Sequence, residues 1–176
     1  MRWWLALACI VALAAGCSGE EDGDPRGDRS PRSASNAEVA DGLGTLFSTT
    51  SPESADVAAC FGDRLAASRT IEQLTDDGLV DDAGTVVESL PPLARDAAAA
   101  WVDAWFSCVD FTAVAGRVQK KVTKTLDVPA FESCFRERLT DDEIRDAATD
   151  GLSGDTASAA VRRLSRAQVH CAELHG

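Results

Sequence analysis

Apolar residues recur at every third or fourth position along most of the chain beyond residue 38, the spacing that places them on one face of an α-helix. Two segments show the pattern most clearly: Leu93, Ala97, Trp101, Ala104, Cys108 and Phe111 in the first, and Ala157, Val161, Leu164, Ala167, Cys171 and Leu174 in the second. Residues 85–87 are the one short stretch that favours a strand. The pattern therefore predicts an all-α helical bundle.

Two short helices are predicted to begin with a capping box, in which a Thr and the residue three positions later bond each other's backbone N–H group. The pairs are Thr70 with Gln73 and Thr140 with Glu143. Each of these helices is predicted to end at a glycine, Gly78 in the first and Gly151 in the second.

Proline and aspartate indicate further helix starts. Ser51-Pro52-Glu53 predicts one start, and Asp127, followed by Val128 and Pro129, predicts another. Residues 110–124 either continue the preceding helix or begin a new one. The apolar positions predicted to face inward in that segment are Phe111, Val114, Val118 and Val122.

The N-terminus carries a targeting signal. Residues 3–15 form an apolar run of thirteen after Arg2, about 20 Å long as a helix and too short for a hydrocarbon core of about 30 Å. The run ends in small residues before Cys17, which resembles a bacterial lipoprotein signal. That resemblance implies a mature chain that begins at Cys17 and is held to the membrane by lipid, through more than one acyl chain. The alternative is an ordinary signal peptide with an incidental cysteine.

The segment after Cys17 is rich in Gly, Ser, Pro, Asp and Arg, which predicts a flexible tether over residues 17–36. The whole chain carries 29 acidic and 17 basic residues, a net charge of −12, and loss of Arg2 with the signal makes this −13. A nucleic-acid partner is disfavoured because phosphate binding needs a basic face. An acidic protein is also repelled by an anionic membrane, so the lipid anchor must hold it there.

Four cysteines remain when Cys9 leaves with the signal and Cys17 takes the lipid. They are Cys60, Cys108, Cys134 and Cys171. An even number in an exported chain indicates two disulfides, with three possible pairings. The wide spacing and the absence of a C-x-x-C pair disfavour zinc. No metal and no cofactor is predicted.

An internal repeat separates the three pairings. Residues 60–65, CFGDRL, match residues 134–139, CFRERL, at an offset of 74. If the chain is a duplication, each copy most simply closes its own bridge. We therefore predict Cys60–Cys108 and Cys134–Cys171, in helical modules over residues 37–127 and 128–176 that together form one compact domain. Each bridge would contribute about 4 kcal/mol by the loop-entropy model.

The same residues carry a resemblance to a family. The order C-x4-L from Cys60 to Leu65, then Leu-Pro-Pro-Leu-Ala over residues 90–94, then Cys-Val-Asp over residues 108–110 resembles uncharacterised putative lipoproteins of actinobacterial type with repeated Cys-bearing helical units. The second module lacks the Leu-Pro-Pro element. The resemblance implies the stapled helical architecture and no particular activity.

No catalytic residue is predicted. His170 and His175 are five positions apart and lie on different faces of a helix, and the acidic residues fit a solvated surface. Two features are candidates for contact with a partner. Arg117, Lys121 and Lys124 are predicted to form one basic stripe, suited to an anionic headgroup, a wall polymer or an acidic partner, or simply to a helix C-terminus. Trp105 is either core or an anchor at the edge of the bundle.

The sequence thus favours an extracytoplasmic lipoprotein that acts as a protein-interaction or ligand-binding module, with an unknown envelope protein or small ligand as partner. The alternatives are an envelope enzyme accessory or carboxylate-based hydrolase, and a carrier or sensor of apolar ligands. A cleft of carboxylates with raised pKa values would favour the enzyme. An apolar cavity between the modules would favour the carrier.

Overall fold

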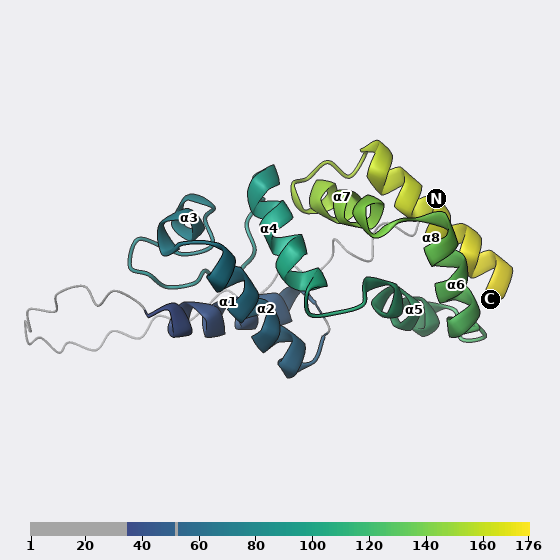
Figure 1. Cartoon of the computed structure of the whole chain (residues 1–176), viewed down its shortest axis with the longest axis horizontal. Coiled ribbons are helices and arrows are strands. Elements are labelled where there is room, and N and C mark those ends of the chain that lie inside the picture. Colours follow the sequence, from purple (N-terminus) through teal and green to yellow (C-terminus); the bar gives the residue numbers. More distant parts are fainter. Residues whose placement is uncertain (1–34, 52) are drawn as a thin grey trace, which may run out of the picture. The chain divides into compact units, whose positions relative to one another are not determined.

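The computed structural model describes residues 35–51 and 53–176, and within them the regular structure consists of eight α-helices (Figure 1). These are α1 (Asn36–Thr50), α2 (Ala55–Ser68), α3 (Ile71–Asp76), α4 (Arg95–Phe106), α5 (Phe111–Val122), α6 (Val128–Arg138), α7 (Asp141–Leu152) and α8 (Ala159–His175). The predicted all-α bundle is confirmed. The predicted signal peptide, Cys17, the tether up to residue 34 and Pro52 lie outside the described residues.

Helices α1 and α2 pack so closely that their backbones touch. A Cβ atom added at Gly62 of α2 would lie 2.0 Å from the carbonyl oxygen of Ala40, and one at Gly44 of α1 would lie 2.7 Å from that of Ala58. Glycine is required here because any side chain would push the helices apart. The close approach buries the apolar faces of both helices, including the stacked rings of Phe47 and Phe61.

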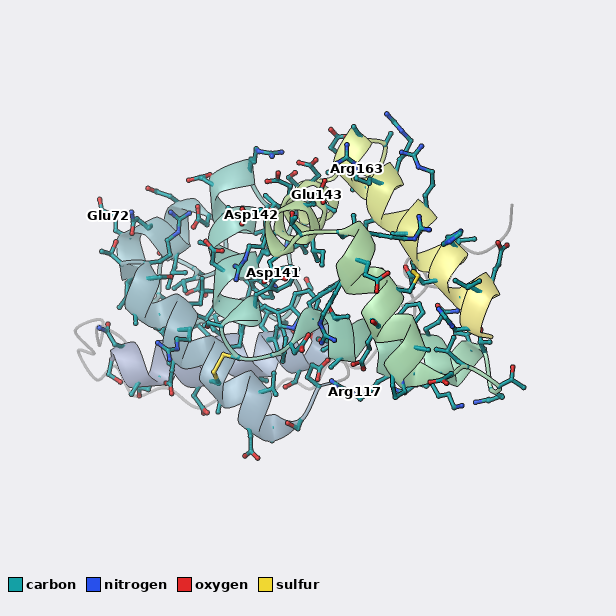
Figure 2. The ribbon with its side chains drawn as sticks, turned by 45° about the vertical axis from the view of Figure 1, so that its right-hand side comes forward. Glu72, Arg117, Asp141, Asp142, Glu143 and Arg163 are labelled. Carbon is teal, nitrogen blue, oxygen red and sulfur yellow. A yellow bond between two sulfur atoms is a disulfide. The ribbon has the colours of Figure 1, made fainter. Side chains whose placement is uncertain are left out.

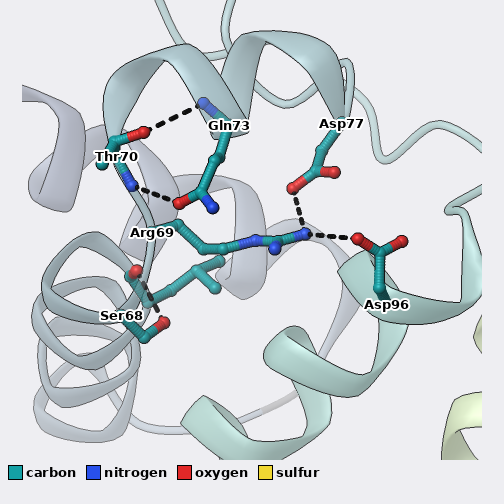
Figure 3. A network of polar contacts seen from close by, with 7 residues as sticks. Ser68, Arg69, Thr70, Gln73, Asp77 and Asp96 are labelled. Atoms are coloured by element: carbon teal, nitrogen blue, oxygen red, sulfur yellow. Dashed lines mark hydrogen bonds and ion pairs between the residues drawn. The ribbon is translucent and has the colours of Figure 1, made fainter.

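The irregular segment between α3 and α4 is held by a half-buried arginine. Arg69, which follows α2, places its Nη2 atom 2.7 Å from Asp77 after α3 and 3.4 Å from Asp96 in α4 (Figure 3). Gly78 follows with a φ of +74°, a left-handed conformation that glycine adopts without strain. In the segment expected to favour a strand, Val86 makes one isolated bridge with Val80.

Helix α5 is a new helix. Ser107 ends α4, and the Asp110 side chain accepts hydrogen bonds from Thr112 N–H at 2.9 Å and Ala113 N–H at 3.2 Å, which caps α5. The cap shows that residues 110–124 begin a new helix and do not continue α4. Helix α5 packs on α6, and its Phe111 contributes to a second core cluster built around Phe131 and Phe135.

Both predicted disulfides are present. Cys60 of α2 bonds Cys108 beyond α4, and Cys134 of α6 bonds Cys171 of α8. Each bond therefore joins segments that are distant in sequence, α2 to the end of α4 and α6 to α8, and packs with one of the two core clusters. Disulfides of this kind persist in oxidising compartments, which indicates an extracytoplasmic environment for the folded chain.

Several sequence expectations about helix ends are wrong. The N-cap of α2 is Ser54, whose hydroxyl accepts from Val57 N–H, while Ser51 ends α1. Gly151 lies inside α7, and the left-handed glycine comes later, at Gly154 with a φ of +88°. The capping boxes at Thr70 and Thr140, and the start of α6 after Asp127, are confirmed.

Three side chains expected to face inward are exposed: Val118, Val122 and Leu174. Each lies in the second half of its helix. Helical spacing shows only that residues share a face, and no described element covers that face in these parts of α5 and α8. Ala157, expected in the last helical stripe, precedes the helix, whose N-cap is Ser158.

Candidate functional site

Charge is distributed unevenly between the two parts of the described chain. Residues 35–110 carry 14 acidic and three basic side chains, a net charge of −11. Residues 111–176 carry ten of each and are neutral overall. The acidic character of the protein therefore belongs to α1–α4 and their connections, and a partner that carries negative charge is repelled less by α5–α8.

The second half of α5 presents cations and apolar side chains together. We call this the α5 surface and define it by six residues: Arg117, Val118, Lys120, Lys121, Val122 and Lys124 (Arg117 is labelled in Figure 2). Val118 is 40% exposed and Val122 is 50% exposed. The surface contains every lysine of the protein.

The cations of the α5 surface differ in what they contact. Arg117 lies 3.2 Å from a carboxylate oxygen of Glu53, and the Lys120 ammonium donates to the carbonyl oxygen of Leu126 at 2.7 Å. Within the described residues, Lys121 and Lys124 form no ion pair. Those two lysines therefore keep their charge available to a partner.

The way α5 packs explains why this surface is open. Its first half is covered, with Thr112 and Val114 buried, and Gly116 lies so close to α6 that an added Cβ atom would be 3.0 Å from Val128 and Glu132. Beyond Gly116 the helix is exposed on most sides. The helix dipole explains cations near a helix C-terminus, but it gives no reason for exposed valines there.

Helix α8 contacts α5 and carries an exposed aliphatic side chain of its own. The Gln168 side chain donates to Gln119 of α5 at 3.3 Å, and the next residue, Val169, is 56% exposed. The α6 start and the end of α8 are joined by a hydrogen bond from Asp127 N–H to the carbonyl oxygen of His175 at 2.9 Å. These two contacts hold α8 against α5 and the start of α6.

Of the predicted partner-facing residues, Trp105 lies apart from the cations. Its half-buried indole packs edge-on against Phe47, Phe106 and Phe111, at ring distances of 6.0, 5.4 and 5.8 Å. These contacts join the first core cluster to the aromatic residues of the second. The indole N–H is buried and has no hydrogen-bond partner among the described residues. Packing therefore explains Trp105, and its contact with a partner stays a prediction.

Arg117, Lys121 and Lys124 do not form the single helical stripe that their spacing predicts. Helix α5 ends at Val122, so Lys124 lies in the turn that follows. The structure nevertheless keeps all three exposed, and it adds Val118 and Val122 to them. The sequence does place the two valines beside the predicted stripe, because Val118 follows Arg117 and Val122 follows Lys121.

Carboxyl groups with shifted pKa values belong to ion pairs and caps. Burial alone would raise the pKa of Asp110, but hydrogen bonds from Ala113 N–H and Arg136 outweigh it and hold the pKa below its ordinary value. The pKa of Asp150 is lowered by the Ser158 hydroxyl, against burial, and by Arg95. The described carboxyls with a resolved shift are all lowered: Asp96, Asp110, Glu143 and Asp150. A lowered pKa suits charge pairing and is the opposite of what a general acid needs.

The acidic residues at the start of α7 have structural partners of this kind. Figure 2 shows Asp141, Asp142 and Glu143 there, with Arg163 of α8 beside Glu143. The pKa of Glu143 is lowered by the Thr140 backbone N–H, which completes the capping box, and by Arg163. This cluster therefore links α7 to α8 and stabilises a helix start.

The other side chains with potential chemistry are dispersed. His170 contacts Arg138, with 2.7 Å between the Nη2 and Nε2 atoms. No group of three His, Cys, Asp or Glu side chains that could hold a metal ion occurs in residues 35–51 and 53–176. None of the eight helices there is long and apolar enough to cross a bilayer.

Two open grooves flank α1. One, of about 320 Å³, lies along α2, and the other, of about 520 Å³, lies along residues 83–88. Both are lined by residues of the first predicted module, with Asp41 and Thr45 on the ridge between them. Neither groove is the cavity between modules that carriage of an apolar ligand would need.

No protein-family profile, no curated protein and no solved structure matches this chain. Its function therefore has to be argued from its own residues.

Proposed function

We propose that this protein is a lipid-anchored extracytoplasmic module that binds an anionic partner through the α5 surface. The supporting observation is that Lys121 and Lys124, which form no ion pair within residues 35–51 and 53–176, lie with exposed Val118 and Val122 on a protein that is otherwise acidic. Neighbouring exposed apolar side chains rimmed by polar or charged groups can mark an interaction site, and the cations add attraction for an anionic partner.

The lipid anchor is part of this proposal. The apolar run before Cys17 and the small residues beside it support cleavage and lipidation at that cysteine. Two or more acyl chains give stable membrane attachment, whereas one is marginal. Substitution of Cys17→Ser should release the protein into the medium, and retention of the variant in the membrane fraction would contradict the anchor.

The two disulfide-bonded cysteine pairs also support the inference that the chain arose by duplication. Both pairs begin with the same C-F-x-acid-R-L pattern, from Cys60 and from Cys134. The resemblance to actinobacterial putative lipoproteins belongs to the same proposal. In this interpretation the binding surface lies on α5, near the end of the first predicted module (residues 37–127).

Affinity capture from native membranes tests the binding role. The lipidated protein is purified in mild detergent beside a variant with Lys121→Ser, Val122→Ser and Lys124→Ser. A matched control carries Arg64→Ser, which removes an exposed cation of α2 that forms no ion pair within the described residues. We expect specific lipids or proteins to be enriched with the wild type and the control and lost with the triple variant. Equal recovery with all three proteins would refute binding of a protein partner through the α5 surface.

A further inference from the structure

We propose that the partner of the α5 surface is the anionic phospholipid bilayer itself, and that this contact docks the domain in one orientation. Helix α5 then lies against the headgroups, and the acidic residues of α1–α4 are turned toward solvent. The inference rests on the lipid anchor in the proposed function and goes beyond it by naming the ligand class and the orientation.

The composition of the α5 surface fits a lipid headgroup region. Lys121 and Lys124 are exposed point charges that can each donate to a phosphate oxygen. Val118 and Val122 are four positions apart on the same helix and are both exposed, so they can enter the boundary between headgroups and acyl chains together. Cations beside aliphatic side chains on one helical face are the features of helices that lie in a membrane interface.

The charge distribution determines which side can approach the membrane. With a net charge of −11, residues 35–110 are repelled by an anionic leaflet, while residues 111–176 have no net charge. The field of the leaflet falls off within a Debye length of about 8–10 Å, so only groups near the surface feel it. An approach through α5 brings Lys121 and Lys124 into the field, whereas an approach through α1–α4 brings mostly carboxylates.

The anchor makes a weak contact sufficient. A short tether holds the domain at a local concentration on the order of millimolar, so the second contact is effectively intramolecular. Each cation close to an anionic surface strengthens binding by about fivefold. Removal of Lys121 and Lys124 should therefore weaken docking by about 25-fold. An acidic protein partner would use the same cations but would not depend on the lipid, which provides the basis of the test.

The lysine content of the protein makes a direct test possible. All three lysines, Lys120, Lys121 and Lys124, belong to the α5 surface, so an amine-reactive acetylating reagent reports on that surface. The lipidated protein is reconstituted into vesicles of phosphatidylcholine alone or with phosphatidylglycerol. The acetylation rate of each lysine is then measured by peptide mass spectrometry.

We expect the rates at Lys121 and Lys124 to fall at least about fivefold on the vesicles with phosphatidylglycerol. They should recover at about 0.5 M NaCl, where the field is screened over a few ångströms. The substitutions Val118→Ser and Val122→Ser, which leave every charge in place, should reduce the protection. Substitution of Val169→Ser on α8 is the matched control and should preserve most of it.

Equal rates on the two kinds of vesicle would overturn the inference. If the rates are equal on both kinds of vesicle but the triple variant captures fewer specific proteins than the wild type, the bilayer inference fails while the proposed interaction function stands. If capture is also unchanged, both proposals fail. The two experiments therefore distinguish a lipid surface from an acidic protein as the partner.

Discussion

The contact between α1 and α2 allows a quantitative prediction for Gly62→Ala. The added Cβ atom would lie 2.0 Å from the carbonyl oxygen of Ala40 and 2.9 Å from the amide nitrogen of Gly44. Both atoms are backbone, so rotation of a side chain cannot relieve the overlap. The helices must separate by about 1 Å, and a gap of that size forfeits a quarter to a half of the dispersion energy of the contacts across it.

The expected loss of unfolding free energy is about 3 kcal/mol, at the upper end of the usual cost of overpacking, because the layer between the helices includes Phe47 and Phe61. For a domain of this size, that corresponds to a fall of about 10 °C in Tm. Urea and thermal unfolding followed by circular dichroism measure both quantities on the mature chain.

The matched control is Gly151→Ala. Gly151 lies inside α7, and a Cβ atom there would meet nothing within 4 Å. Alanine is a better helix former than glycine, so this variant should gain about 0.5 kcal/mol. If Gly62→Ala unfolds within about 0.5 kcal/mol of the wild type, the two helix backbones are not in contact and the reasoning is refuted.

Three further predictions concern the bridges, one ion pair and the aromatic cluster. Joint substitution of Cys134→Ala and Cys171→Ala should cost about 4 kcal/mol of stability by the loop-entropy model, and unchanged urea unfolding would contradict this. Because the pKa of Asp110 is lowered on folding, its charge contributes stability above its unfolded pKa of 3.8 that is lost as pH falls through the folded value. Asp110→Asn keeps a good N-cap residue, so it should unfold with a flatter dependence on pH below about pH 4, and a slope equal to the wild type would exclude Asp110, with its Ala113 N–H and Arg136 partners, as a source of that dependence. Trp105→Ala should lose about 2–4 kcal/mol in urea unfolding, whereas Trp105→Phe should lose much less because the indole N–H has no hydrogen-bond partner in the part of the chain that the structure describes; equal losses would refute this.

Local rules and one repeat were enough to predict much of the fold. Capping boxes at Thr70 and Thr140 depend on residues three positions apart, and the structure contains both. The disulfide pairing followed from the match between the segments at Cys60 and Cys134, because a duplicated unit closes its own bridge. The capping boxes could be predicted because they depend on residues close in sequence. The disulfide pairing could be predicted because the repeat is visible when the chain is compared with itself.

Features that depend on tertiary packing could not be predicted in this way. The periodicity of α5 placed Val118 and Val122 on an inner face, but nothing in the spacing tells whether another helix covers that face. The start of α2 was placed at Ser51 because a proline follows it, whereas Ser54 is the cap. Ser51 and Ser54 are both good N-cap residues, so residue preference alone does not decide between them.

The measurement that tests the binding role of α5 most directly is the mobility of a nitroxide label in native membranes. Single labels are attached at Val122→Cys on the α5 surface and at Glu88→Cys, an exposed position in the acidic part of the chain. The electron paramagnetic resonance spectrum is recorded in native membranes and in detergent. We expect the label at position 122 to be immobilised in membranes and mobile in detergent, and the label at position 88 to be mobile in both. Equal mobility of the two labels in native membranes would contradict the account.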